Sequence, residues 1–187
     1  MIEIKRQAVH IGLLVIALLL KYLTRWQAVA VLGLLLFITL FVMPQLTIRS
    51  HFYRELERRY SAGAVLYVLL LLVLLLVFPL PVVAASWAIL ALGDGAATLI
   101  GTHFKANALP WNPEKTFAGS IAFLVFGTLG ASALLWWMLP ALEWRSVLFL
   151  GVKTTMVAAI VESLPWKIND NITVPLASAV VLSLLMA

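Results

Sequence analysis

Residues 60–93 read YSAGAVLYVLLLLVLLLVFPLPVVAASWAILALG, a run of 34 positions without a charged side chain that ends directly before Asp94. A helix crosses the hydrocarbon core of a bilayer with about 20 apolar residues, so this run is too long for one span. Pro79 and Pro81 interrupt the helical pattern near its middle. The stretch therefore predicts two consecutive membrane-spanning helices, at 62–78 and 82–101, and the second carries a carboxylate.

The composition of the whole chain indicates the same class of protein. Of its 187 residues, 64% are hydrophobic and 11% are charged, whereas soluble domains average roughly 45–50% apolar and about 25% charged residues. Neither a soluble domain nor a disordered chain has this balance. We expect an all-α polytopic helix bundle that forms one transmembrane domain over residues 1–187. Its seven predicted spans are 7–23, 27–44, 62–78, 82–101, 113–139, 145–163 and 171–187.

Basic residues are distributed unevenly among the predicted loops. The side that contains the N-terminus carries nine lysines and arginines, and the opposite side carries three. Basic loops stay in the cytoplasm, so we expect a cytoplasmic N-terminus and a C-terminus on the opposite side. The net charge of +5 is explained by these loops and by contacts with anionic lipids, which argues against nucleic acid as a partner. Because the chain has no cysteine, thiolate metal sites and cysteine nucleophiles are excluded.

Residues 47–60, TIRSHFYRELERRY, carry an apolar side chain at every fourth position from 48 onward. This spacing predicts an amphipathic helix at the membrane interface. The arginines lie largely off the apolar stripe, so Arg54 and Arg59 are candidates for contacts with lipid phosphates or a nucleotide. The alternative is a solvated connector that is stabilised by pairing of Glu55 with Arg59.

Asp94 lies about 12 residues into the predicted span 82–101. A carboxylate at that depth costs several kcal/mol unless it is paired or hydrated. We therefore expect Asp94 to have a functional role, in the coordination of Mg²⁺. Small residues at every fourth position from 93 to 101 predict close packing against a neighbouring helix. Thr98 shares a helical face with Asp94, and the glycines on both sides of Asp94 permit an unwound backbone that lines a cavity.

Further oxygen ligands lie at the cytoplasmic ends of the last two spans. Glu162 shares a helical face with small residues one and two turns earlier, so it is predicted to point into the bundle. Asn169-Asp170-Asn171 opens the last span, where an N-cap role is one explanation of the triplet. The other is that Asp170 and Asn171 join Asp94 and Glu162 in a site for a hard cation, with Mg²⁺ as the cofactor.

Residues 112–116, Asn-Pro-Glu-Lys-Thr, read as a helix start with Asn112 as the N-cap and proline at the first helical position. Lys115 would then lie in the first turn, where backbone N–H groups favour a phosphate. The alternative is an ordinary capped helix whose lysine reaches toward the interface. His10, one turn inside the first span, is equally a lipid headgroup contact or a base that accepts a proton from a substrate hydroxyl.

These residues together resemble the nucleotide-binding signature of the family of integral membrane polyprenol kinases, which includes dolichol kinases, phytol kinases and CTP-dependent diacylglycerol kinases. The similar runs are DGAATLIG at 94–101 and EKTFAGS at 114–120. Further similarities, in the same order as in the family, are Glu3, Lys5, Arg6 and His10; Arg54, Glu55, Arg59, Gly63 and Ala64; and Glu162 to Pro165, Asp170, Asn171 and Val174 to Leu176. Lys105, Glu114 and Ala118 depart from the family pattern, which usually has glycine, lysine and glutamate there.

The resemblance implies a CTP-dependent kinase that phosphorylates a membrane lipid alcohol, such as phytol or dolichol, at the cytoplasmic face. It implies Mg²⁺ as cofactor and Asp94, His10 and Glu162 as candidate catalytic residues. The candidate metal ligands are Asp94, Glu162, Asp170 and Asn171. The candidate nucleotide-binding residues are Asp94, Gly95, Ala97, Thr98, Gly101, Lys115, Thr116, Gly119, Arg54 and Arg59.

Two other classes of function remain open from the sequence. One is a related enzyme that uses diacylglycerol as acceptor or transfers a cytidylyl group, as phosphatidate cytidylyltransferases do. The other is a transporter or lipid carrier in which Asp94 and Glu162 are ion sites. The expected partners of the kinase are a nucleotide, a lipid alcohol and membrane lipids, and the sequence gives no indication of an oligomeric state.

Overall fold

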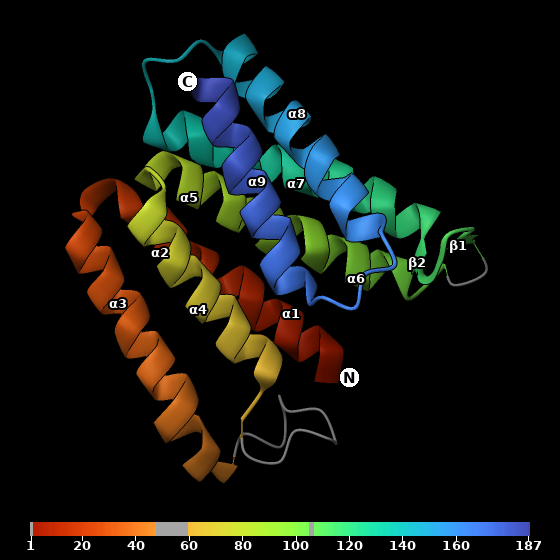
Figure 1. The fold of residues 1–187 in the computed structure, drawn as a ribbon, viewed down its shortest axis with the longest axis horizontal. Helices are drawn as coiled ribbons and strands as arrows, with labels where there is room; N and C mark the ends of the chain where they lie inside the picture. Colours follow the sequence, from red (N-terminus) through yellow and green to blue (C-terminus); the bar gives the residue numbers. More distant parts are fainter. Residues whose placement is uncertain (1, 48–59, 105–106) are drawn as a thin grey trace.

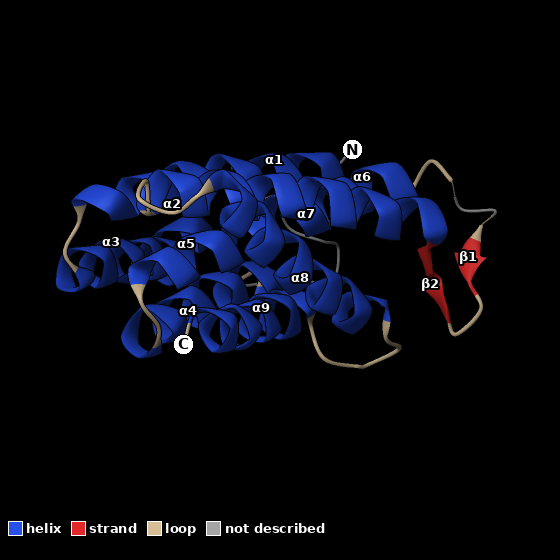
Figure 2. Cartoon of the chain, turned by 90° about the horizontal axis from the view of Figure 1, so that it is seen from above, coloured by secondary structure: helices blue, strands red, loops and turns tan. Residues whose placement is uncertain are grey.

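The computed structural model describes residues 2–47, 60–104 and 107–187, and within these ranges the chain forms seven helical segments and one hairpin (Figures 1 and 2). The first helical segment consists of α1 (Ile2–Gly12), α2 (Leu14–Leu19) and η1 (Leu20–Tyr22). The second consists of α3 (Arg25–Phe37), η2 (Ile38–Val42) and η3 (Met43–Gln45). The middle of the chain forms α4 (Ala62–Val77), α5 (Leu80–Ala88), η5 (Ile89–Asp94) and α6 (Gly95–Gly101). The hairpin β1 (Ala108–Leu109) and β2 (Asn112–Thr116) precedes α7 (Phe117–Met138), α8 (Trp144–Ser163) and α9 (Asp170–Met186).

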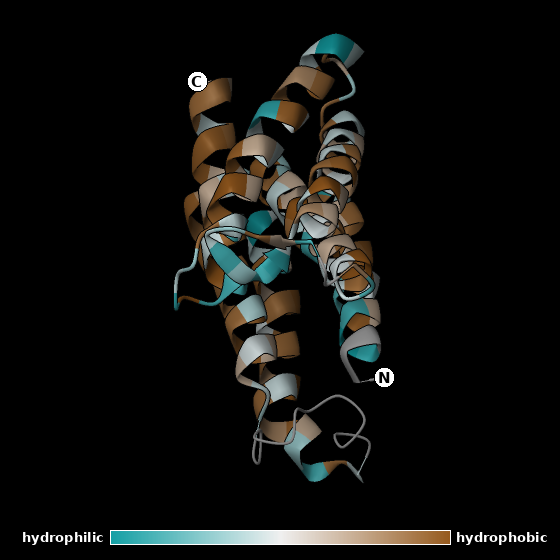
Figure 3. Cartoon of the chain, turned by 90° about the vertical axis from the view of Figure 1, so that its right-hand side faces the viewer, coloured by the Kyte–Doolittle hydropathy of each residue, from teal (hydrophilic) through white to brown (hydrophobic). Residues whose placement is uncertain are grey.

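This architecture confirms the predicted all-α membrane bundle. Four segments of the described chain are long and apolar enough to cross a membrane, namely Arg25–Gln45, Leu80–Gly101, Phe117–Met138 and Trp144–Ser163, and α4 and α9 are shorter apolar helices. Figure 3 shows hydrophobic residues over most of the helical surface, as a lipid-facing protein requires. The predicted amphipathic helix at 47–60, with Arg54 and Arg59, falls outside the described residues except at its two ends.

The central element of the bundle is the continuous rod formed by α5, η5 and α6. Every residue from Val82 to Ala91 in this rod is buried, and the rod packs against α7, α9, α2 and α1. Pro79 stands at the N-cap of α5, where its fixed φ and missing N–H do no harm. The helix that carries Asp94 is therefore held on several sides by protein rather than by lipid.

Small residues bring η5 and α6 unusually close to α7. A Cβ atom added at Gly93 would lie 3.4 Å from Cα of Gly127, and one added at Gly101 would lie 3.6 Å from Cα of Gly119. This close approach confirms the packing that the four-residue spacing predicts.

The backbone at Asp94 differs from the prediction of an unwound segment. Residues Ile89–Asp94 form a π-helical turn, and Asp94 has helical φ and ψ of −65° and −38°. The close packing on α7 favours a continuous helix over a loop, so the backbone forms a wider helical turn and its hydrogen bonding continues into α6. Short π-helical turns of this kind are frequent at functional sites.

The predicted helix start at Asn112, and with it the span start at 113, is wrong. Residues Asn112–Thr116 form strand β2, which pairs antiparallel with β1, and α7 begins at Phe117. Asn112 precedes a proline and is therefore biased toward extended backbone. Thr116 has the extended conformation of an N-cap, and its hydroxyl accepts a hydrogen bond of 3.1 Å from the N–H of Gly119.

Figure 1 places the start of α1 and the end of α9 at opposite ends of the bundle. This arrangement agrees with an odd number of crossings. The sidedness of the two termini in the cell stays a prediction of the basic-residue count.

We expect Gly127→Ala to destabilise the bundle, because the added methyl group would lie 2.8 Å from Cγ2 of Thr155. Overpacking of this kind costs about 1–3 kcal/mol. The matched control is Gly33→Ala in α3, where an added Cβ meets no atom within 4 Å, and alanine favours helix by up to about 1 kcal/mol. Thermal unfolding in detergent should give a lower melting temperature for the first variant only, and equal melting temperatures would contradict the packing argument.

Candidate active site

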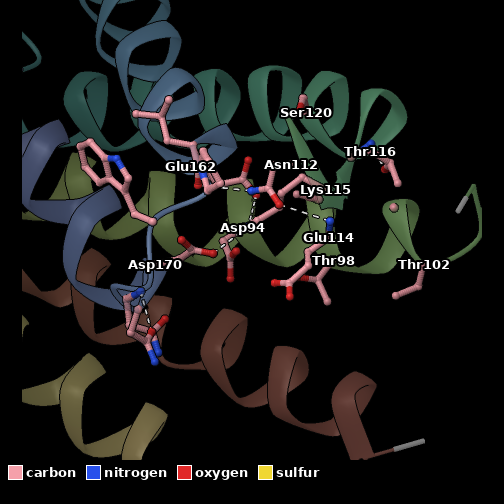
Figure 4. Close-up of a pocket in the computed structure, with 18 of the residues that line it drawn as sticks. Asp94, Thr98, Thr102, Asn112, Glu114, Lys115, Thr116, Ser120, Glu162 and Asp170 are labelled. Carbon is pink, nitrogen blue, oxygen red and sulfur yellow. Dashed lines mark hydrogen bonds and ion pairs between the residues drawn. The ribbon is translucent and has the colours of Figure 1, made fainter. Parts of the chain in front are cut away.

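A polar cavity of about 1110 Å³ opens among α1, η5, α6, β2, the start of α7 and the α8–α9 connection (Figure 4). It is built by segments from almost the whole chain. The residues of the predicted site that line it are His10, Asp94, Ala97, Thr98, Gly101, Lys115, Thr116, Gly119, Glu162, Asp170 and Asn171. Most of the residues that the sequence predicts for the site therefore line this one cavity.

Three carboxylates meet at the centre of this cavity. Asp94 comes from η5, Glu162 from the last turn of α8 and Asp170 from the first turn of α9. One oxygen of each lies within 4.8 Å of the others. Glu162 is only 2% exposed, as its predicted inward orientation requires.

Lys115 neutralises part of this negative charge. Its Nζ donates to Oε1 of Glu162 at 2.5 Å and to Oδ2 of Asp170 at 2.7 Å. Burial lowers the pKa of Lys115, but the negative charges of Glu162 and Asp170 outweigh burial and hold its pKa above the ordinary value for lysine. The ammonium is therefore charged at neutral pH and belongs to the carboxylate cluster, whereas the predicted position in the first turn of a helix is wrong.

Asn112 fixes the strand that carries Lys115. Its Nδ2 donates to the carbonyl oxygens of Ser163 and Leu164, both at 3.2 Å, and its Oδ1 accepts from the N–H of Glu114 at 3.2 Å. These bonds tie β2 to the end of α8, directly beside Glu162. Asn112 thus sets the distance between Lys115 and the carboxylates instead of capping α7.

The donor set fits a hard divalent cation. Carboxylate oxygens are the preferred protein ligands of Mg²⁺, and three of them converge here. In addition, Oε2 of Glu162 is buried and has no hydrogen-bond partner among the described residues. A buried carboxylate oxygen without a partner is costly, and coordination of a cation would satisfy it.

His10 lies in the wall of the cavity that α1 forms, and it is buried. Its ring stacks on Tyr67 of α4 with 4.3 Å between ring centroids. The hydroxyl of Tyr67 donates to the backbone oxygen of His10 at 3.3 Å and accepts from Nε1 of Trp87 at 2.6 Å. Both the ring and the backbone of His10 are therefore positioned by the helix bundle.

Gly95 and Asn171 make contacts with neighbouring helices. Gly95 faces α1, where an added Cβ would lie 3.3 Å from Cδ1 of Ile11, and it does not line the cavity. Asn171 lines the cavity, and its Nδ2 donates to the backbone oxygen of Gly63 at 3.0 Å, which ties α9 to α4. The carboxylates that could bind a metal together are Asp94, Glu162 and Asp170, and the amide oxygen of Asn171 stays a predicted further ligand.

The cavity also contains residues that sequence reasoning did not assign to the site. Gln7 and Ser120 are the most informative, because each has a buried side-chain oxygen without a hydrogen-bond partner among the described residues. Ser120 could have been found from its place at the end of the EKTFAGS run. Gln7 carries no charge and belongs to no quoted motif, and its only sequence signal is its spacing of three residues from His10.

Comparison with curated proteins finds plant phytol kinases. "Probable phytol kinase 1, chloroplastic" of Glycine max is 38% identical over 127 residues, which cover 64% of this chain and 42% of the relative. "Phytol kinase 1, chloroplastic" of Arabidopsis thaliana is 37% identical over 124 residues, 62% of this chain and 41% of the relative. "Probable phytol kinase, chloroplastic" of Triticum aestivum is 34% identical over 131 residues, 66% and 44% respectively.

The chain is similar in sequence to these phytol kinases over 62–66% of its own length. This relationship confirms the resemblance that the motifs indicate. The chain spans less than half the length of these three relatives. No family model matches it, and no solved structure matches it.

We expect Lys115→Met to lower the stability of the protein in metal-free buffer. The substitution leaves Glu162 and Asp170 without their shared cation. Glu162 is buried but Lys115 and Asp170 are partly exposed, so the cost should lie between the roughly 1 kcal/mol of an exposed pair and the roughly 3–5 kcal/mol of a buried one. Addition of Mg²⁺ or Mn²⁺ should restore more of the melting temperature in this variant than it adds to the wild type, because the cation replaces the missing charge.

The matched control for this experiment is Lys153→Met. Lys153 is exposed on α8, and its ammonium lies 4.2 Å from the ring centroid of Phe149, away from the carboxylates. Metal-free melting temperatures that are equal for Lys115→Met and the wild type would show that the ion pairs do not stabilise the site.

Proposed function

We propose that the protein is a Mg²⁺-dependent kinase that transfers a phosphoryl group from a nucleotide to the hydroxyl group of a membrane lipid alcohol, such as phytol. The observation that carries the proposal is the cluster of three carboxylates and one lysine in a polar cavity of a membrane bundle. The sequence similarity to phytol kinases supports the substrate class. The motifs at 94–101 and 114–120 support CTP as the donor, by resemblance.

Phosphoryl transfer depends on positioning and on neutralisation of phosphate charge. Asp94, Glu162 and Asp170 would hold Mg²⁺, which would supply that neutralisation. Lys115 would turn from the carboxylates to the phosphates, since its ammonium can form charge-assisted hydrogen bonds to either group. Its place on a strand that Asn112 ties to α8 keeps it within reach of both.

The wall formed by α6 and the start of α7 suits the nucleotide. Ala97, Gly101 and Gly119 line this wall, at the place where α6 and α7 pack closely on each other. The N-terminus of α7 opens on this wall and favours an anion. The hydroxyl of Ser120, buried in the same wall, would donate to a phosphate oxygen.

The acceptor would approach from the side of the cavity formed by α1. The apolar chain of a lipid alcohol stays in the bilayer while its hydroxyl group reaches the cavity. His10, held by Tyr67, or one of the carboxylates would accept the hydroxyl proton as the phosphoryl group is transferred. By the basic-residue count, we place this end of the multi-pass bundle at the cytoplasmic face.

The kinase accounts for the site better than a transporter does. The candidate metal ligands lie together at one cavity with a lysine between them, whereas a transport pathway needs polar sites that connect both faces. The central rod from Val82 to Ala91 is filled with buried, mostly apolar residues. The related enzymes, diacylglycerol kinase and cytidylyltransferase, differ from our proposal only in acceptor and transferred group, so the same assay separates them.

We expect Asp94→Asn to reduce turnover at least 100-fold while the protein still folds, because the amide keeps the size of the side chain and loses the charge that binds the metal. Glu143→Gln is the matched control, since Glu143 is exposed and stands at the N-cap position of α8 without a side-chain capping bond. Initial rates with phytol in lipid nanodiscs test both variants. Turnover of Asp94→Asn within about threefold of the wild type would remove the metal role.

We also expect CTP to be used in preference to ATP. This expectation comes from the resemblance of 94–101 and 114–120 to the family signature. The measurement is the initial rate of product formation with each nucleotide, with phytol, dolichol and diacylglycerol as acceptors. Equal rates with ATP would defeat the choice of nucleotide, and formation of a cytidylylated product would replace the kinase with a cytidylyltransferase.

A further inference from the structure

Gln7 of α1 has a side chain whose environment the site described so far does not explain. It is 5% exposed and lines the cavity, and its amide oxygen Oε1 is buried without a hydrogen-bond partner among the described residues. Leaving a buried acceptor unpaired costs about 1–3 kcal/mol. An unpaired acceptor in a cavity wall is well suited to a ligand that brings a hydrogen-bond donor.

The amide oxygen lies next to the helical turn that carries Asp94. A Cβ atom added at Gly95 would lie 3.6 Å from Oε1 of Gln7, so the oxygen is in van der Waals range of the residue that follows Asp94. His10 is one turn further along α1, is buried too, and lines the same cavity. Gln7 and His10 therefore present two polar side chains on one face of α1, beside the first of the three carboxylates.

The position of α1 indicates from which side that ligand comes. Val9, between Gln7 and His10, is 43% exposed on the outer surface of a bundle that is apolar outside. Figure 2 shows α1 in an outer layer of the bundle, together with α6 and α7. α1 is therefore one of the helices that a molecule in the bilayer can contact directly.

The chemistry of the oxygen limits the kind of group that it can bind. An amide oxygen accepts a hydrogen bond and needs a donor, and ionised phosphate oxygens offer none. The hydroxyl group of a lipid alcohol offers one, as do the ribose and base of a nucleotide. The exposure of α1 on the apolar outer surface favours the lipid alcohol, while Lys115, Ser120 and Arg6 are donors for phosphates.

We propose that Gln7 binds the hydroxyl group of the lipid alcohol and thereby sets the specificity of the site for an alcohol acceptor. This inference rests on the proposed function. The amide of Gln7 holds the hydroxyl oxygen beside Asp94 while His10 lies one turn away. No bond is made or broken by Gln7, which acts by binding.

The test uses Gln7→Met, which keeps the length of the side chain and removes the amide. Because the oxygen has no partner in the free protein, the variant should melt in detergent at or above the melting temperature of the wild type when no acceptor is present. With phytol, the wild type should be stabilised more than the variant. The KM for phytol should rise about tenfold, as expected for loss of one hydrogen bond, and the KM for CTP should change less than twofold.

Gln45→Met is the matched control. Gln45 is exposed at the end of the second helical segment, where its Nε2 donates to the backbone oxygen of Phe41 at 2.7 Å. This variant should leave both KM values unchanged. If Gln7→Met does not accumulate, Gln7→Leu serves in its place, because it also removes the amide and should likewise raise the KM for phytol.

Three results would overturn the inference. They are an unchanged KM for phytol, a raised KM for CTP instead, and a lower melting temperature of Gln7→Met without acceptor, which would make Gln7 a structural residue. Equal stabilisation of wild type and variant by phytol would mean that the amide binds only water. If the wild type phosphorylates no alcohol but phytol still stabilises it more than Gln7→Met, the kinase proposal fails while binding of the hydroxyl by Gln7 stands.

Discussion

Three carboxylates within 4.8 Å of one another repel each other strongly, and one of them, Glu162, is almost fully buried in an apolar bundle. The ion pairs of Lys115 with Glu162 and Asp170 make this arrangement tolerable. Much of the local structure follows from the need to bring one ammonium group to this place. Lys115 lies on strand β2 of the hairpin, and the hydrogen bonds of Asn112 hold this hairpin against the end of α8. A cation bound to the carboxylates would neutralise the same negative charge that Lys115 neutralises. Binding of a metal and the ion pairs of Lys115 would therefore depend on each other.

The second requirement is a cavity beside a closely packed helix. η5 and α6 pack closely on α7 through Gly93, Gly101, Gly119 and Gly127. Two of these glycines, Gly101 and Gly119, also line the cavity. The π-helical turn at Ile89–Asp94 widens the helix at the residue that carries the carboxylate. Helix packing and the proposed site therefore share Gly101 and Gly119.

Local rules predicted what depends on local sequence. Length and hydropathy predicted the all-α membrane bundle, the depth of Asp94 in a span marked it as a candidate functional residue, and helical periodicity placed Glu162 on an inward face. Residues 112–116 were predicted wrongly because their structure depends on distant partners. Lys115 pairs with a residue 47 positions away, and Asn112 bonds to one 51 positions away. The hydrogen bond from Asn171 to Gly63, 108 positions earlier, was not foreseen for the same reason. Gln7 was missed because an uncharged side chain next to Lys5 and Arg6 gives no signal until its unpaired oxygen is located.

The groups around the carboxylates suggest where each substrate of the proposed reaction binds. The ammonium of Lys115 on β2 and the hydroxyl of Ser120 on α7 are donors that match phosphate oxygens. On α1, the cavity is lined by Arg6, whose guanidinium is also a donor, and by Gln7, whose amide oxygen is an acceptor that matches a hydroxyl group. The three carboxylates come from η5, α8 and α9 (Figure 4). In-line phosphoryl transfer requires the attacking and leaving oxygens on opposite sides of the phosphorus atom. A nucleotide held by Lys115 and Ser120 and a lipid alcohol held by Gln7 would meet at the carboxylates in that geometry.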